Sequence, residues 1–220
     1  RDLRIDGGVF DIAKSVIRYL KIADRRFRLE GASEIPLRSG LAGSTAMLAA
    51  VYGVVCKFLG LNTSRYECAE TIRHIELNYM DIQCGYQDQY MTVFGGLNCM
   101  EFRGKEYYRT LQEEPFATVE PLGDLLRGLP MVVISTGLRR VSGHILKPVR
   151  ERWLEGDPVV RRGYRRITEL ARRGKRALLS RDWRTLAGLM NENHSIQQQV
   201  GASGEAIDEA IDLARRAGAW

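Results

Sequence analysis

A glycine-rich loop that joins a short extended run to a long apolar helix is the feature that most constrains the fold of this chain. The loop reads Pro-Leu-Arg-Ser-Gly-Leu-Ala-Gly-Ser-Thr-Ala over residues 36–46. Gly40 and Gly43 allow the backbone to turn tightly with its N–H groups facing inward. Ser44 is expected to cap the helix that follows, so an anion would meet free amides and the positive end of that helix. The loop therefore predicts a nucleotide-phosphate site.

The segments around this loop alternate between helical and extended patterns. Apolar spacing predicts a helix over 9–23 and a short strand over 26–30, directly before the loop. A second helix is expected over 44–59, and it is apolar on nearly every face, which predicts that it is buried. Asn-Thr-Ser at 62–64 is expected to cap a third helix that ends near Met80.

The pattern changes after Gly85. Four short strands joined by glycine-containing turns are predicted, which favours an antiparallel meander; they cover 90–94, 97–102, 106–110 and 116–120. A buried strand is expected over 130–137, and the chain from Val141 to Ala219 has almost entirely helical patterns. We predict an α+β protein with a domain boundary near residue 128, giving domains 1–128 and 129–220.

Composition excludes several classes of protein. The 220 residues are 45% hydrophobic and 27% charged, which is enough for a sizeable core. No segment approaches the roughly 20 apolar residues of a membrane helix, and the first residues lack the apolar core of a signal peptide. Four widely spaced cysteines suggest neither a zinc site nor a disulfide framework. A cytoplasmic protein with no membrane partner is expected.

The net charge of +6 arises from basic pairs that follow residue 138. A basic half invites a nucleic-acid interpretation, which would predict steeply salt-dependent binding. In 159–170, however, Val160, Tyr164, Ile167 and Leu170 recur at helical spacing with arginines between them, which indicates an amphipathic helix with a solvated basic face. No base-reading motif accompanies the charge, so no nucleic-acid partner is expected.

Several motifs occur along the chain in an order that resembles a known family. They are Pro-x-x-x-Gly-Leu at 36–41, Glu76, Gly-Tyr-Gln-Asp-Gln-Tyr at 85–90, Phe-Gly-Gly-Leu-Asn at 94–98, and Ser-Thr-Gly at 135–137 with Arg140 and Ser142. This order resembles the GHMP small-molecule kinases over nearly the whole chain. Within that family it most resembles the sugar 1-kinase branch of D-glycero-D-manno-heptose 7-phosphate kinase, to which 145–158 and 190–195 are also similar.

The resemblance implies a fold with two domains. The N-terminal one would be a mixed domain like the second domain of ribosomal protein S5, and the C-terminal one a helix-rich, ferredoxin-like domain. Family members begin with a strand that carries a substrate-binding motif and end with a glycine loop, and neither is expected within these 220 residues. Ala42-Gly43-Ser44 stands where the family usually has Gly-Ser-Ser.

The resemblance also implies a reaction, the transfer of the ATP γ-phosphate to the anomeric hydroxyl of a sugar. Heptose 7-phosphate is the first expectation, and fucose, galactose, glucuronate and mevalonate are acceptors of other branches. Such transfer requires amides, magnesium ligands and one carboxylate near the acceptor hydroxyl. A non-catalytic sugar- or nucleotide-binding protein on the same fold is the rival interpretation. The resemblance leaves room for a homodimer.

The resemblance assigns roles to individual residues. ATP would be bound by Ser39, Gly40, Leu41, Ala42, Gly43, Ser44 and Thr45; Mg²⁺ by Ser44 and Glu76; and the substrate by Gln87, Thr136, Gly137 and Arg140, with Asp88 as the catalytic residue. Taken singly, these residues have ordinary explanations as a helix cap, an exposed carboxylate, a turn residue and a solvated arginine. The histidines, at positions 74, 144 and 194, are expected to be satisfied or exposed rather than metal ligands.

Overall fold

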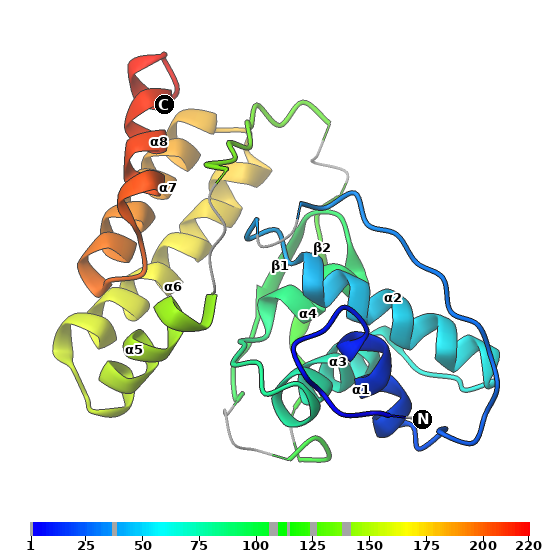
Figure 1. Ribbon diagram of the computed structural model, residues 1–220. Helices are drawn as coiled ribbons and strands as arrows, with labels where there is room; N and C mark the ends of the chain where they lie inside the picture. The colour runs from blue at the N-terminus through cyan, green and yellow to red at the C-terminus, as the bar shows by residue number, and fades with distance from the viewer. Residues whose placement is uncertain (1, 37–38, 106–109, 114, 124–126, 138–141) are drawn as a thin grey trace. The chain divides into compact units, whose positions relative to one another are not determined.

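The computed structural model describes residues 2–36, 39–105, 110–113, 115–123, 127–137 and 142–220 (Figure 1). The chain divides into two compact units, Arg1–Gly123 and Asp124–Trp220. The division lies close to the predicted boundary near residue 128. Helices and strands together form a mixed α+β architecture.

The N-terminal unit consists of helices and one small sheet. Its elements are α1 (Asp11–Tyr19), α2 (Gly43–Phe58), α3 (Arg65–Tyr79), α4 (Gln87–Phe94), β1 (Asn98–Glu101) and β2 (Thr118–Pro121). The two strands pair antiparallel, with Asn98 opposite Pro121 and Glu101 opposite Thr118. The predicted strands at 97–102 and 116–120 are thereby confirmed, whereas most of 106–110 lies outside the described residues.

The main core of this unit is formed where α1, α2 and α3 meet, and Val16, Leu48 and Ile72 are fully or almost fully buried there. The start of α3 is fixed by the predicted cap. Ser64 Oγ accepts the Glu67 N–H at 3.2 Å, and the Glu67 carboxylate accepts the Ser64 N–H at 2.7 Å. This reciprocal pair satisfies two donors that a helix start otherwise leaves unpaired.

Helix α2 differs from its prediction in two respects. It begins at Gly43 after Ala42, whose φ of 54° is left-handed, and no side chain caps it. Ser44 therefore lies inside the first turn, and the expectation that it caps the helix is wrong. Val54 and Phe58 are 50% and 61% exposed, so α2 is buried along one face and not all round.

Three predicted strands have other conformations. Residues 26–30 form no ladder among the described residues, although Phe27 and Leu29 pack against the core. Residues 90–94 belong to α4, because Tyr90, Val93 and Phe94 recur at helical spacing and form one apolar cluster. Residues 130–137 form no strand within the described part of the chain, and Met131–Ile134 are exposed, so the prediction of a buried strand there is wrong.

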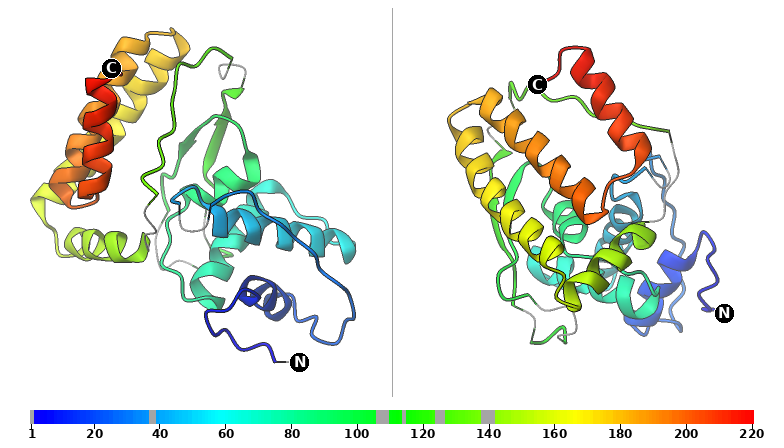
Figure 2. Two further views of the ribbon diagram at one scale, coloured as in Figure 1. Left: turned by 45° about the horizontal axis from the view of Figure 1, so that its top comes forward. Right: turned by 90° about the vertical axis from the view of Figure 1, so that its left-hand side faces the viewer.

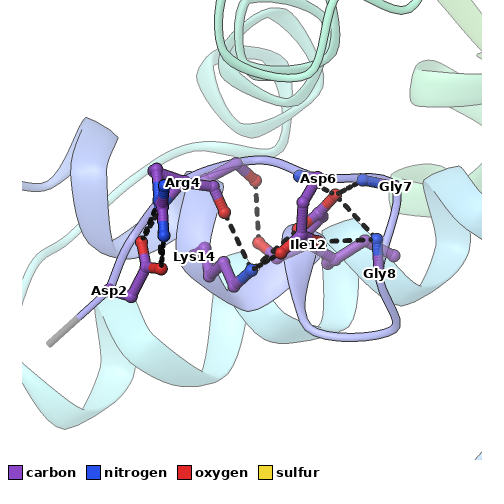
Figure 3. Close-up of polar contacts among 9 residues, drawn as sticks. Asp2, Arg4, Asp6, Gly7, Gly8, Ile12 and Lys14 are labelled. Atoms are coloured by element: carbon purple, nitrogen blue, oxygen red, sulfur yellow. Dashed lines mark hydrogen bonds and ion pairs between the residues drawn. The ribbon is translucent and has the colours of Figure 1, made fainter.

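The N-terminal segment is held on α1 by a compact polar network. Asp11 is buried, and its Oδ2 accepts the N–H groups of Asp6, Gly7 and Gly8 at 3.1, 2.7 and 3.1 Å. Figure 3 shows Lys14 reaching the same turn, where its Nζ donates to the Arg4 carbonyl at 2.8 Å. These bonds satisfy the backbone of a turn that precedes the first helix.

From Ser142 onward the C-terminal unit is almost entirely helical, as predicted from Val141 onward. Its elements are α5 (Ser142–Leu154), α6 (Pro158–Leu179), α7 (Trp183–Val200) and α8 (Glu205–Arg216). Helices α6 and α7 lie side by side, as both views of Figure 2 show. Gly163 permits this approach, because a Cβ there would lie 2.9 Å from Val200 Cγ1.

The amphipathic pattern of α6 is confirmed. Val160 and Leu170 are buried, and Tyr164 and Ile167 pack against the same cluster. The arginines at 161, 162, 165, 172, 173 and 176 are exposed. No helix in the described ranges combines the length and apolar character needed to cross a bilayer.

Candidate active site

Two left-handed residues, Gly40 and Ala42, lie at the end of the glycine-rich loop, and Ala42 directly precedes α2. Gly40 has a φ of 78° and Ala42 a φ of 54°. Gly43 then packs closely, because a Cβ at that position would lie 3.0 Å from Ile35 Cγ2. The predicted turn is therefore present, and the first amides of α2 follow it without a side-chain cap.

Beneath the loop, three helices bring three polar side chains together. Thr45 Oγ1 of α2 donates to Glu76 Oε1 of α3 at 2.7 Å, and Gln89 Nε2 of α4 donates to Glu76 Oε2. The three residues are 5%, 2% and 1% exposed. We call Thr45, Glu76 and Gln89 the polar triad. Its members are 31 and 13 positions apart in sequence and meet only because α2, α3 and α4 pack together.

The electrostatics of the polar triad follow from its burial. Burial raises the pKa of Glu76 above its usual range, while hydrogen bonds from Thr45, Gln89 and Cys84 oppose the rise and the charge of Asp88 adds to it. Removal from water disfavours the charged form of a carboxyl group unless donors or a cation compensate. A cation at this position would therefore favour ionised Glu76.

Asp88 occupies the first turn of α4, next to Gln89. Asp88 as a whole is exposed, yet partial removal of its carboxyl group from water raises the pKa of that group above its usual value. Ser44 and Gln87 are also exposed. Of the predicted site residues of this unit, Thr45 and Glu76 are buried, Ser39, Ala42 and Gly43 are half-buried, and the exposed ones are Gly40, Leu41, Ser44, Gln87 and Asp88.

The hydroxyl that faces Glu76 is Thr45, whereas the sequence-based hypothesis assigned Ser44 to magnesium together with Glu76. No hydrogen bond of Ser44 to Glu76 occurs within the described structure, and Ser44 is exposed. The packing of α2 against α3 buries the side chain at 45 and leaves that at 44 exposed. Thr45 was expected only as a residue of the ATP loop.

Arg73 is a residue of this site that sequence reasoning missed. It is 5% exposed, its Nε donates to the Gly85 carbonyl at 3.0 Å, and its guanidinium carbon lies 3.8 Å from the centroid of the Tyr86 ring. It thus fixes the turn that leads into α4 and Asp88. A signal existed in the sequence, since Arg73 lies one turn before Glu76 on the same helix.

A second buried polar cluster lies on the same helix and was also missed. Glu70 accepts hydrogen bonds from Tyr90 Oη and Lys105 Nζ, and the Glu70 and Lys105 side chains are each 3% exposed. Tyr90 Oη in turn accepts the Ala117 N–H at 2.9 Å. This Glu70 cluster joins α3 and α4 to the segments that flank the two strands.

The remaining predicted site residues belong to the C-terminal unit. Thr136 and Gly137 are exposed within the segment 130–137, and Arg140 lies outside the described residues. His74 and His194 lie within α3 and α7, as expected. His194 Nε2 lies 3.1 Å from Asp208 Oδ1, which is the contact of a structural histidine.

The donor chemistry of the polar triad fits a hard cation such as Mg²⁺. Its hydroxyl, carboxylate and amide oxygens are the ligand types that Mg²⁺ prefers. Two buried oxygens near the loop, Gln89 Oε1 and Ser39 Oγ, have no hydrogen-bond partner among the described residues. Those residues contain no cluster of three or more His, Cys, Asp or Glu side chains suited to a metal. A cation here would therefore take few protein ligands and keep waters or substrate oxygens.

Comparison with protein families identifies both units. The model of the GHMP kinases N-terminal domain matches residues 9–96, which hold the loop and the polar triad, and the model of the GHMP kinases C-terminal domain matches residues 175–220. The chain therefore contains both GHMP kinase domains. The expected resemblance to this family is confirmed at that level.

Individual relatives carry different kinase names. The chain is 28% identical to glucuronokinase 1 of Arabidopsis thaliana over 204 residues, which cover 91% of this chain and 55% of the relative. It is 29% identical to mevalonate kinase of Pyrococcus horikoshii over 217 residues, covering 93% and 60%.

A third relative matches a shorter region. D-glycero-alpha-D-manno-heptose 7-phosphate kinase of Campylobacter jejuni is 37% identical over 99 residues, which cover 43% of this chain and 29% of that protein. The chain spans between half and three fifths of the length of the relatives that match it throughout. These similarities support the kinase family and leave several acceptors to be compared.

Proposed function

We propose that the protein containing this chain transfers the γ-phosphate of ATP to a hydroxyl group of a small anionic molecule. The observation that carries the proposal is the convergence of α2, α3 and α4 on Glu76, directly behind the glycine-rich loop and beside Asp88. The presence of both GHMP kinase domains supports the same chemistry.

The residues of the N-terminal unit divide the work of phosphoryl transfer. Residues 39–45 would place backbone amides and the uncapped start of α2 against the phosphates of ATP. Arg73 would hold the turn before α4, so that Asp88 keeps its position relative to the loop. Positioning of this kind supplies most of the catalysis in phosphoryl transfer, because little covalent help is needed from the protein.

Asp88 would act on the acceptor hydroxyl. The acceptor oxygen bonds to the γ-phosphorus as the bond from that phosphorus to the bridging oxygen breaks, ADP leaves, and the hydroxyl proton passes to the Asp88 carboxylate. The raised pKa of Asp88 suits this role, since a carboxylate that is harder to ionise holds a proton more readily.

Thr45, Glu76 and the exposed Ser44 are the residues of this chain that would hold Mg²⁺. When bound, Mg²⁺ would neutralise charge on the transferred phosphoryl group. Thr45 is the hydroxyl that donates to Glu76, while Ser44 is exposed in the first turn of α2.

For the acceptor, we propose a sugar that carries an anionic group and is phosphorylated at its anomeric hydroxyl. Heptose 7-phosphate keeps support from the relative in Campylobacter jejuni, and glucuronate gains support from glucuronokinase 1 of Arabidopsis thaliana. Mevalonate, which is also an anion, is supported by the mevalonate kinase of Pyrococcus horikoshii. Gln87, Thr136, Gly137 and Arg140 stay proposed acceptor-binding residues.

Phosphorus NMR of the full-length gene product tests this function. ATP, Mg²⁺ and each acceptor in turn (heptose 7-phosphate, glucuronate, fucose, galactose and mevalonate) would be supplied to wild type, Asp88→Asn and a control, Asp81→Asn. Asp81 is exposed and left-handed, a conformation that asparagine adopts readily. We expect a new phosphate ester signal with at least one acceptor, lost in Asp88→Asn and kept in Asp81→Asn.

Two outcomes would count against the proposal. Turnover that is unchanged in Asp88→Asn would remove Asp88 from its role. Binding of ATP or of an acceptor without any turnover in wild type would support the rival interpretation, a non-catalytic binding protein on the kinase fold.

A further inference from the structure

The side-chain amide of Gln89 has a hydrogen-bond partner for its nitrogen but none, among the described residues, for its oxygen. Nε2 donates to Glu76 Oε2, whereas Oε1 is buried and meets no donor among the described residues. The residue as a whole is 1% exposed. A buried acceptor without a donor is unfavourable, because it has lost water and gained nothing in exchange.

The orientation of this amide follows from its neighbour. An ionised carboxylate can only accept hydrogen bonds, so the Gln89 amide must turn its nitrogen towards Glu76. Its oxygen is then left as a buried acceptor without a donor among the described residues. Thr45 already donates to the other oxygen of Glu76 and has no second proton to offer.

A divalent cation would give the buried Gln89 Oε1 the partner that no protein donor supplies among the described residues. Two neutral oxygens and one carboxylate, contributed by three different helices, form a set of hard ligands of low total charge. We propose that Gln89 is a ligand of the cation site. Its Nε2 orients Glu76, and its Oε1 is one of the oxygen ligands of the cation. This inference rests on the proposed kinase function and adds Gln89 to the residues assigned to it.

Binding of Mn²⁺, followed by the EPR signal of the free ion, tests the assignment without turnover. Gln89→Met keeps the length and burial of the side chain and removes both polar atoms. Gln89→Glu keeps an oxygen at the same place and removes the donor to Glu76. Gln112→Met is the matched control, because Gln112 is an exposed glutamine of the same unit.

We expect Gln89→Met to weaken Mn²⁺ binding by about tenfold or more, the range found when residues around a metal are changed. Gln112→Met should bind as wild type does. Gln89→Glu should bind Mn²⁺ at least as tightly as wild type, whereas a purely structural Gln89 would be harmed by losing its donor to Glu76. If Gln89→Met does not fold, as judged by circular dichroism, Gln89→Glu decides the matter alone.

The failures are distinguishable. Wild-type Mn²⁺ affinity in Gln89→Met, or weakened binding in a folded Gln89→Glu, would overturn the role of Gln89 and leave the kinase proposal intact if wild type still turns over. Wild-type protein that turns over ATP but leaves the Mn²⁺ signal unchanged would likewise overturn the role of Gln89. Absence of both Mn²⁺ binding and turnover in wild type would overturn the proposed function and this inference with it.

Discussion

The two units of the molecule differ in how far they bury their charged side chains. In the N-terminal unit, α3 buries Glu70, Arg73 and Glu76, each 5% exposed or less. In the C-terminal unit, the ion pair of Arg166 with Glu192 has side chains 39% and 40% exposed. Buried charges are costly to desolvate, and exposed pairs contribute little to stability.

The difference indicates what each arrangement does. The three buried groups follow one another along one face of α3, at spacings of three residues. Each contacts the segment 85–90: Glu70 contacts Tyr90, Arg73 contacts the Gly85 carbonyl, and Glu76 contacts Gln89. The polar face of α3 therefore fixes the segment that carries Asp88. The exposed ion pairs of α6 and α7, in contrast, add little to helices that apolar packing already holds together.

Breaking the buried pair should give the largest effect. Lys105→Met leaves Glu70 buried without its cation, and loss of one partner of such a pair costs about 3–5 kcal/mol. Hydrogen exchange of α3 and α4 would measure the loss. The double variant Lys105→Met with Glu70→Met should recover much of it. If the amides of α3 and α4 exchanged in Lys105→Met as slowly as in wild type, the buried pair would not stabilise the N-terminal unit more than the exposed pairs stabilise the C-terminal unit.

An internal control comes with this experiment. The chain has three tryptophans, Trp153, Trp183 and Trp220, and all lie in the C-terminal unit. Their fluorescence during urea unfolding therefore reports on that unit alone. We expect the tryptophan transition of Lys105→Met to match that of wild type while the N-terminal unit loses stability.

Tyr90→Phe should have the next largest effect. The hydroxyl of Tyr90 donates to Glu70 and accepts the N–H of Ala117, so its removal leaves two buried groups each with one partner fewer. Unsatisfied buried groups cost about 1–3 kcal/mol. Hydrogen exchange of the Ala117 amide would show the loss directly. Unchanged protection of that amide would show that the Glu70 cluster is not a stabilising network.

Ser64→Ala tests a polar contact of the N-terminal unit that is exposed. Removal of a helix cap costs about 1 kcal/mol on average, less than either buried change. Urea unfolding followed by far-ultraviolet circular dichroism measures it, with Ser33→Ala, on an exposed loop outside every helix, as the control. A cost above that of Tyr90→Phe would contradict the ranking of buried over exposed contacts.

The sequence predicted the loop and its partners better than it predicted their register. The motif located the turn and Glu76, but it did not indicate that Thr45 would donate to Glu76; the assignment of Ser44 and Glu76 to Mg²⁺ stays a prediction. Adjacent helical residues point about 100° apart, so Ser44 and Thr45 face different directions, and only the packing of α2 against α3 decides which of the two is buried. Caps at left-handed residues such as Ala42 leave no clear sequence signal.

Contacts between distant positions were the least predictable part. Glu70 and Lys105 are 35 positions apart, and nothing in the spacing of either residue marks them as a pair. Tyr90 was expected in a strand because its neighbours are β-branched and aromatic, yet packing against α3 places it in a helix. The helices of the C-terminal unit were predicted well, because long amphipathic patterns depend on local spacing alone.

Acidification should weaken the contact between α7 and α8. Hydrogen bonds from Ser203 above all, then from Gln198, and the nearby His194 lower the pKa of Asp208 below its ordinary value. A lowered folded-state pKa stabilises the fold above the unfolded pKa, and that contribution is lost as pH falls through the folded value. The tryptophan transition should therefore move to lower urea between pH 5 and pH 2. In Ser203→Ala this movement should be smaller, and an equal movement would show that Asp208 is not responsible.

Glu192→Gln should give the smallest effect and completes the comparison. Arg166 Nε lies 2.6 Å from Glu192 Oε1, yet Arg166 also pairs with Glu169 at 2.7 Å, and all three side chains are well exposed. Solvent and salt screen such pairs, and the guanidinium keeps one carboxylate partner after the change. We expect no measurable movement of the tryptophan transition at pH 7 and physiological salt. A loss of unfolding free energy as large as that of Tyr90→Phe would show that polar contacts of the C-terminal unit stabilise the fold as much as those along α3. The two units would then differ in how far their charged groups are buried, and not in how much those groups stabilise the fold.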